Sequence, residues 1–354
     1  MSLLEHTVVK IQPQDQQARS EALTRLQQLT MPSWALGRLM DLAMDMAGIT
    51  GSMKPPAEQK VIVIMAGDHG VVAEGVSKYP QEVTCQMVRN FINGGAGINA
   101  IARTTRSKVV VVDLGVAGDL SDLVESGLVL SKRIGPGTRN IAQGPAMNRE
   151  EAIRSIEAGI QVALDLADST DVFGTGEMGI GNTTPSSAIT ASFTRHSAAE
   201  VTGRGTGLDD TSFRHKISVI ERSLQINQSH QGDPVDLLAK LGGFEIGGIA
   251  GLILGAASLR KPVVIDGFIS TAGALIANGI NPLAGDYMIA AHRSVEPGHL
   301  AALEHLGKIP LLDLDLRLGE GTGAALAMTL VEASCRILTE VSTFEEASVS
   351  GADK

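Results

Sequence analysis

The chain has 354 residues, of which 44% are hydrophobic and only 3% aromatic, with 40 glycines and a formal net charge of −10. This length excludes a single small module and predicts one large domain with a smaller appendage, or two domains that share a cleft. The acidic balance, with dispersed lysines and arginines, argues against a nucleic-acid surface or an anionic membrane face.

The N-terminal segment lacks the basic start and apolar stretch of a secretory signal, so a cytoplasmic protein is expected. Residues 14–50 then contain two helical patterns, and the linker GSMKPPAEQ (51–59) separates them from the first β-branched run. Cys85 and Cys335 lie far apart in apolar, helix-like patterns, which predicts two buried thiols and no disulfide framework.

Six short β-branched runs follow, separated by longer segments with helical periodicity. Continuous apolar strands that alternate with helices indicate a parallel sheet covered on both faces, with right-handed crossovers. The expected fold class is therefore α/β, with a mostly parallel, doubly wound, Rossmann-like sheet of about six strands. The expected strands are VIVIMA (61–66), KVVVVD (108–113), DVF (171–173), PVVID (262–266), YMIAA (287–291) and IPLLDL (309–314).

Two further segments read as helices. The apolar, glycine-rich stretch 246–259 is too short to cross a bilayer and predicts a buried or subunit-interface helix. Residues 321–341 form one amphipathic helix after the last strand, and the final dozen residues look frayed. We expect residues 1–58 and 322–354 to form a small helical subdomain, and residues 59–321 to form the large α/β catalytic domain.

In a parallel sheet, ligands gather at the carboxyl ends of the strands. The segments that follow the expected strands are mostly glycine-rich and carry one or two polar groups, which predicts one continuous pocket along this edge. These segments are GDHG (67–70), LGVAG (114–118), GTGEMGIGNTT (174–184), GFIS (267–270), HRSVE (292–296) and RLGEGTG (317–323).

The third of these segments matches the dinucleotide-binding pattern G-x-G-x-x-G through Gly174, Gly176 and Gly179, with a carboxylate, Glu177, in its middle. A dinucleotide fingerprint belongs to the first βαβ unit and needs an acidic residue about twenty residues later. Here the pattern follows the third strand and no such residue comes next. NAD binding is therefore not expected, and no other cofactor is indicated.

The residues after this pattern predict a helix start, with Asn182 as polar cap and Pro185 at the first helical position. Free backbone N–H groups and the helix dipole at such a start suit a phosphate or a carboxylate. An ordinary capped helix behind a tight turn explains the stretch equally well.

Glu320 lies between two glycines just before the long C-terminal helix. Glycine on both sides allows a ligand to approach the backbone. A carboxylate in an apolar, partly dry pocket has a raised pKa and is a better base near neutral pH. Taken alone, the spacing favours a simpler role, in which Glu320 complements the dipole of the helix that follows.

The segment 202–216 offers an anion clamp of Arg204 and Lys216 with Asp209 and Asp210, or else an exposed helix start with its own ion pairs. Without further support the second interpretation is preferred.

Two other groups of side chains are candidate metal ligands. Asp68 and His69 follow the first strand directly, and His292 and His299 flank a short loop. Neither pair has further ligands at a regular spacing, so no metal site is expected.

Six stretches occur together in one order, which no single motif conveys. They are AGDHGV…YPQEVTCQMV, GTRNIAQGPAM, GTGEMGIGNTT, GRGTGLDD, AAHRSVEPGH and LDLRLGEGTGAALA. In this order the chain resembles the nicotinate-nucleotide:dimethylbenzimidazole phosphoribosyltransferases, from about residue 61 to 336. The resemblance implies transfer of the phosphoribosyl group of nicotinate mononucleotide to 5,6-dimethylbenzimidazole, which gives nicotinate and α-ribazole 5′-phosphate for cobalamin assembly.

The resemblance also implies roles for individual residues. Glu320 is the base that takes the proton from the benzimidazole nitrogen, and Glu177 lines the pocket for that base. Apolar walls come from Met87, Met178 and Leu318. The phosphate and ribose are held by Gly179, Lys216, Ser294 and the backbone around Asn182, Thr183 and Thr184. The family implies a homodimer in which the helical subdomain helps to cover the neighbour's site.

The implied chemistry agrees with the residues present. Nicotinate is already a pyridinium while it is part of the nucleotide, so its departure from the ribose needs no general acid, and one base suffices. A base opposite the leaving group would turn a β-nucleotide into an α-product. Two alternatives stay open: a nucleotide N-glycosidase that uses water in place of the azole, and a non-catalytic protein that binds a nucleotide or an azole.

Overall fold

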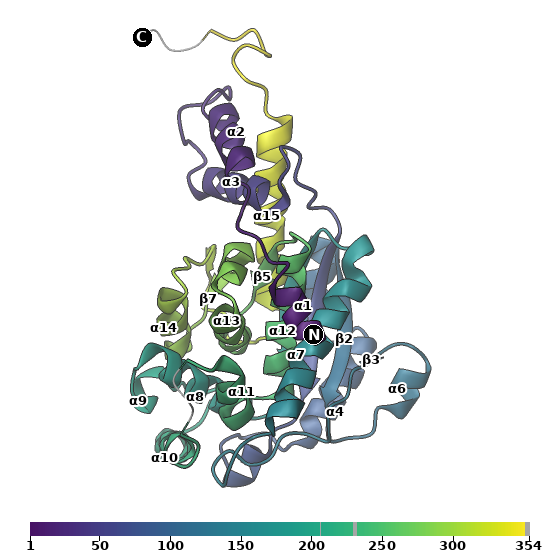
Figure 1. Ribbon diagram of the computed structural model, residues 1–354, viewed down its shortest axis with the longest axis vertical. Helices are drawn as coiled ribbons and strands as arrows, with labels where there is room; N and C mark the ends of the chain where they lie inside the picture. The colour runs from purple at the N-terminus through teal and green to yellow at the C-terminus, as the bar shows by residue number, and fades with distance from the viewer. Residues whose placement is uncertain (206, 229–231, 351–354) are drawn as a thin grey trace.

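The computed structural model of the protein describes residues 1–205, 207–228 and 232–350. A six-stranded sheet, parallel throughout and ordered β3-β2-β1-β4-β5-β6, forms the centre of the large domain, with helices on both faces (Figure 1). Its strands are β1 (Lys60–Gly67), β2 (Ser107–Gly115), β3 (Leu130–Ser131), β4 (Val172–Met178), β5 (Val263–Ile265) and β6 (Met288–Ala290). A separate parallel pair consists of β7 (His292–Arg293) and β8 (Leu312–Asp313).

The α-helices precede, connect and follow these strands. They are α1 (Leu3–Val8), α2 (Gln16–Leu26), α3 (Arg38–Thr50), α4 (Glu82–Ile92), α5 (Gly97–Thr105), α6 (Ser121–Glu125), α7 (Arg149–Leu166), α8 (Thr183–Thr194), α9 (Ala198–Val201), α10 (Asp210–Ile226), α11 (Pro234–Leu241), α12 (Phe244–Ser258), α13 (Phe268–Ile280), α14 (Pro297–His305) and α15 (Thr322–Glu340). Short 3-10 helices cover Gly70–Glu74, Ala167–Ser169 and Pro282–Tyr287.

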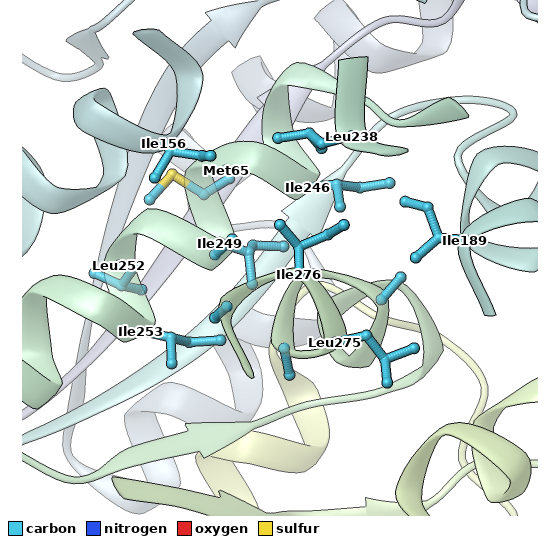
Figure 2. Close-up of a cluster of buried hydrophobic side chains, with 14 of the residues drawn as sticks. Met65, Ile156, Ile189, Leu238, Ile246, Ile249, Leu252, Ile253, Leu275 and Ile276 are labelled. Carbon is cyan, nitrogen blue, oxygen red and sulfur yellow. The ribbon is translucent and has the colours of Figure 1, made fainter. Parts of the chain in front are cut away.

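Strand β1 shows why the sheet is covered on both sides. Its odd-numbered residues from Val61 to Met65 enter a core shared with α7, α12 and α13, and its even-numbered residues from Ile62 to Ala66 enter a core shared with α15. Figure 2 shows the first of these cores, with Met65 among aliphatic side chains of the covering helices. Each such side chain contributes roughly 1.5–3 kcal/mol on burial, so the period-two pattern fixes the strand between two helical layers.

Helices α7 and α12 approach each other through their backbones. A Cβ on Gly159 would overlap the carbonyl oxygen of Gly248, and a Cβ on Gly251 would overlap that of Ile156. The abundance of glycine in this segment therefore serves close helix packing. Helix α12 is buried from Phe244 to Ala257, which confirms the buried alternative for the apolar stretch.

A small helical lobe consists of α2, α3 and the far half of α15, and it stands at the top of Figure 1. Buried residues such as Ala22, Met40 and Leu338 form its own core. Helix α1 instead packs against α7 and α12 of the large domain, and the first half of α15 packs against the sheet. The division into 1–58 with 322–354 and 59–321 stays a prediction, because α15 runs through both parts.

The final dozen residues were expected to be frayed, but the described ones among them make contacts with the N-terminal part of the chain. Thr343 forms an isolated bridge with Leu29, and Glu346 forms an ion pair of 2.8 Å with Arg25 of α2. Residues 351–354, which the same expectation covered, lie outside the described residues. Within the described residues, no helix has both the length and the hydropathy to cross a membrane.

Two expectations about strands are corrected. The run at 309–314 yields only the two-residue β8, outside the main sheet, and the sixth strand of the sheet is β3, which is too short for a sequence pattern. Gly174 to Met178 belong to β4 and not to a loop, so the G-x-G-x-x-G match is largely a buried strand.

The two thiols also differ from each other. Cys335 is buried as expected, whereas Cys85 is only partly buried on α4.

Candidate active site

A cavity of about 760 Å³ opens beyond the carboxyl ends of β4 and β5. All the predicted site residues except Thr184 and Lys216 line it. Four of the six segments expected to form one pocket contribute to this lining, whereas residues 67–70 and 114–118 do not. The lining consists of Val76, Ser77, Tyr79, Val83, Met87, Glu177, Met178, Gly179, Ile180, Gly181, Asn182, Thr183, Gly205, Gly267, Phe268, Ile269, Ser270, His292, Ser294, Glu296, Asp315, Leu316, Arg317, Leu318, Gly319 and Glu320.

Glu177 enters the cavity from the end of β4. Its side chain is 7% exposed and accepts a hydrogen bond from the amide of Asn182. Gly319 must lack a side chain, because a Cβ there would overlap Glu177 Oε1. Burial, followed by the negative charge of Asp266, raises the pKa of Glu177 to about 8. At neutral pH, Glu177 is therefore mostly a protonated carboxylic acid.

Glu320 enters from a left-handed turn just before α15, with φ of 61°. Its Oε2 accepts a hydrogen bond of 3.0 Å from the N–H of Ile98, at the N-terminus of α5. Burial raises the pKa of Glu320, and the nearby charge of Asp266 acts in the same direction, but the N–H groups of Ile98 and Gly97 oppose the rise. Two backbone donors thus favour the ionised form of Glu320.

The two carboxyl groups of this cavity thus differ in the surroundings that shift their pKa values. Pairs of acids whose surroundings displace their pKa values differently are typical of acid–base sites. Glu320 has the helix N-terminus of α5 beneath its carboxylate, whereas the donor for Glu177 is a neutral side-chain amide. Glu320 is therefore the carboxylate better suited to accept a proton.

Lys216 lies behind the cavity wall on α10 and is 1% exposed. Its Nζ donates a hydrogen bond of 2.7 Å to Thr183 Oγ1, and a Cβ on Gly205 would lie 3.3 Å from the same nitrogen. Burial lowers the pKa of Lys216 to about 8, and the charge of Glu296 opposes this. The ammonium group thus acts on the cavity through Thr183 and Gly205, which both line it.

The helix start after β4 differs from the expectation. Helix α8 begins at Thr183, so Pro185 is its third residue, and the side chain of Asn182 binds Glu177 and does not cap the helix. The N–H groups of Asn182 and Thr184 already donate to the carbonyls of Gly179 and Gly181 and are not free for a ligand. Thr184 is fully buried, so the structure does not bring it to the cavity.

The anion clamp of segment 202–216 does not form. Asp209 caps α10 by accepting a hydrogen bond from the N–H of Ser212, and Arg204 pairs with Asp210 at the surface. The exposed helix start is therefore correct for these three residues, and only Lys216 points toward the site.

The histidines considered as metal ligands have other neighbours. Buried His69 pairs with Glu245 at 2.7 Å, and the ring centroids of His292 and His299 lie 5.8 Å apart. Among the described residues, no three of His, Cys, Asp and Glu are grouped as metal ligands would be.

Three cavity residues were not predicted from the sequence to bind the substrates, and one of them, His292, was a candidate only as a metal ligand. Ser270 Oγ, His292 Nδ1 and Glu296 Oε2 are buried and, among the described residues, have no hydrogen-bond partner. Their segments could be found, since each follows a strand, but no motif marks these side chains individually. Polar atoms of this kind at a cavity wall are available to a ligand.

Comparisons with known proteins agree with this geometry. A phosphoribosyltransferase family model matches residues 11–349. Curated relatives named nicotinate-nucleotide–dimethylbenzimidazole phosphoribosyltransferase include one from Syntrophotalea carbinolica, 63% identical over 99% of both chains, and one from Desulfotalea psychrophila, 57% identical over the full length of both. The chain belongs to the nicotinate-nucleotide–dimethylbenzimidazole phosphoribosyltransferase family.

A solved structure extends this similarity to three dimensions. The phosphoribosyltransferase of this family from Thermus thermophilus superposes with a TM-score of 0.90 at 45% identity, covering 96% of this chain and 100% of that one. The α/β fold and the family resemblance expected from the sequence are thereby confirmed. Membership of a phosphoribosyltransferase family also makes the chain a glycosyltransferase by class.

Proposed function

We propose that this chain transfers the phosphoribosyl group of nicotinate mononucleotide to 5,6-dimethylbenzimidazole, with inversion at the anomeric carbon. The observation that carries the proposal is the carboxylate of Glu320, which faces a largely apolar cavity from a helix N-terminus, next to the protonated Glu177. The names of the relatives and the order of motifs support the same substrates.

The reaction balances with one base. The azole nitrogen attacks C1′ of the ribose, the bond from C1′ to the pyridinium nitrogen breaks, and its electron pair leaves with nicotinate. The azole N–H proton goes to Glu320. Removal of this proton raises the nucleophilicity of the azole, and a carboxylate near C1′ favours an oxocarbenium-like transition state. Attack from the face opposite the leaving group gives the α-product from a β-nucleotide.

The two substrates occupy different sides of the cavity in this proposal. The azole lies on the acidic side, which we define as Glu177 and Glu320, between the apolar side chains of Met87, Met178 and Leu318. The ribose phosphate lies on the cationic side, which we define as Thr183, Lys216 and Ser294, with the backbone of Gly179 between the two. The carboxyl group of Glu177 on the strand and an anion site beyond it are thus compatible, because each faces a different part of the substrates.

A homodimer completes the proposal. Val295, Leu314 and Leu318 are apolar, lie in or next to the cavity lining, and are each about half exposed. A second copy that covers these side chains would exclude water from the cavity mouth, which strengthens electrostatic interactions inside it. Sedimentation of the purified chain would test this point, and a cytoplasmic location stays a prediction.

The decisive test is chromatographic analysis of nicotinate mononucleotide incubated with the protein, with and without benzimidazoles, phenol or adenine. The proposal requires nicotinate release that depends on an added azole, together with an α-linked product. Release without an acceptor would indicate an N-glycosidase. Tight binding without any release would indicate a non-catalytic binding protein.

A further inference from the structure

Asp266 is a buried carboxylate next to the cavity that none of the roles above uses. It follows β5 directly and is 1% exposed. Its Oδ2 accepts the N–H of Gly321 at 3.1 Å, and its Oδ1 accepts the N–H of Ala324 at 3.0 Å. Helix α15 begins with Gly321 as its N-cap residue, which has no side chain to offer. Asp266, which lies just after β5, therefore supplies the side-chain cap that this helix lacks in its own sequence.

The backbone that Asp266 holds is the turn that carries Glu320. Gly319, Glu320 and Gly321 have φ values of 84°, 61° and 87°. A left-handed conformation costs a non-glycine residue roughly 1–2 kcal/mol, so Glu320 keeps it only because neighbouring contacts impose it. The bond from Gly321 to Asp266 is one of these contacts and lies one residue from Glu320.

Asp266 is also tied to the strand that carries Glu177. Its own N–H donates a hydrogen bond of 3.0 Å to Thr175 Oγ1 in β4, two residues before Glu177. The same strand touches the turn, because a Cβ on Gly176 would lie 2.8 Å from the carbonyl oxygen of Glu320. Asp266 thus contacts both segments that carry the acids of the cavity: the turn through its carboxylate and β4 through its backbone N–H.

We propose that Asp266 is a positioning residue for the transfer reaction, which holds the Gly319–Gly321 turn so that Glu320 faces the cavity. This inference rests on the proposed function. It is supported by the electrostatic effect of Asp266 on its neighbours, since its charge raises the pKa of both Glu177 and Glu320.

Other charged groups face this cluster from the surrounding elements. His292 on β7 places Nε2 3.7 Å from Asp266 Oδ1. His299 on α14 has its pKa lowered to about 3 by burial and by His292, so it is neutral near neutral pH. The remaining groups are Glu177 on β4, Glu245 on α12, Glu320 before α15 and Arg317 in the lining.

Asp266→Asn tests the inference, because it keeps the shape and one acceptor oxygen but removes the charge. Turnover of the variant should fall about 10- to 100-fold, as expected for a displaced catalytic group, while the KM for nicotinate mononucleotide changes less than about threefold. The acid limb of kcat/KM should move to lower pH, because loss of a like charge lowers the pKa of Glu320. A purely structural defect would not move this limb.

The matched control is Asp171→Asn. Asp171 also accepts two backbone N–H groups, from Glu58 and Gln59, but at the opposite end of β4. Its variant should keep the parent turnover and pH profile. Hydrogen exchange of residues 319–326, which needs no substrate, should accelerate in Asp266→Asn and not in the control.

The outcomes separate the two proposals. If the parent protein transfers phosphoribose and Asp266→Asn keeps its turnover within threefold, or loses turnover with the acid limb unmoved, the inference about Asp266 is overturned. If the parent transfers nothing to any azole, the proposed function fails instead. Should Asp266→Asn not fold, Thr175→Val takes its place, with Thr175→Ser as its control. Loss of turnover in Thr175→Val but not in Thr175→Ser supports the inference, and parent turnover in Thr175→Val contradicts it.

Discussion

The acidic side and the cationic side of the cavity are built in different ways. On the acidic side, Glu320 and Glu177 lie in the lining itself, and backbone donors reach one of them. On the cationic side, Lys216 stays behind the wall and acts through the hydroxyl of Thr183. A group that must exchange a proton with a substrate has to touch it, whereas a group that attracts an anion can act through an intervening donor.

The difference predicts that the acidic side controls turnover. Glu320→Gln should lower kcat by roughly 10²–10⁴-fold, as loss of a general base does, with little change in thermal stability. Glu177→Gln should keep kcat at pH 7 within about tenfold of the parent, because glutamine resembles the protonated acid that Glu177 already is. Steady-state kinetics of both variants provide the test. A larger loss in Glu177→Gln than in Glu320→Gln would reverse the two roles.

The cationic side should control affinity. Lys216→Met removes a charge-assisted interaction, so the KM for nicotinate mononucleotide should rise roughly 10- to 100-fold, with kcat much less affected. Lys261→Met is a suitable control, since Lys261 donates to the carbonyl of Thr170 outside the cavity lining. If Lys216→Met lowered kcat at unchanged KM, the division of labour between the two sides would be wrong.

The space between the two carboxyl groups can be tested with glycines. Gly319→Ala forces a left-handed alanine against Glu177 Oε1, whereas Gly307→Ala forces a left-handed alanine with nothing within 4 Å. Both variants place an alanine in the left-handed backbone conformation, so the difference between their free energies of unfolding isolates the steric overlap. Gly319→Ala should be less stable by about 1–3 kcal/mol more than Gly307→Ala, measured by denaturant unfolding. Equal losses would show that Glu177 moves aside freely.

The smallest of the predicted effects is the pH dependence of thermal stability that comes from Glu177. The pKa of Glu177 is raised from 4.5 to about 8, so the fold binds a proton that the unfolded chain releases. This contribution to stability is complete below the unfolded pKa and is lost as the pH rises through about 8. Between pH 6 and pH 9 the parent should lose a few degrees more in Tm than Glu177→Gln. Lys216 titrates in both proteins and cancels in the comparison, and parallel Tm curves would contradict the assignment.

The sequence predicted the sheet where its strands are long and apolar, because continuous β-branched runs mark strands buried on both faces. It could not predict β3, which has two residues, nor the extension of β4 through glycines that usually mark turns. Gly176 is explained by the close turn at Glu320, and Gly174 by the side chains of Ile62 and Met328, and these partners lie far away in the chain.

The sequence predicted most of the segments that form the candidate site, but it predicted the contacts and roles of individual side chains only in part. Glu320 is framed by glycines, and the frame is visible in the sequence, but its partner Ile98 is 222 residues away. Asp266 closes an ordinary strand pattern, and nothing local shows that its oxygens cap a helix begun more than fifty residues later. Contacts of this kind depend on topology, and local patterns do not carry them.

Helix α15 begins at the turn of Glu320 and ends in the small helical lobe, where Leu338 is part of that lobe's core (Figure 1). Its 19 residues span ~28 Å at the usual rise of an α-helix. The helix therefore connects the Gly319–Gly321 turn to the small helical lobe, where α2 and α3 pack against its far half. A tilt of the lobe relative to the sheet would therefore change the position of the Glu320 carboxylate.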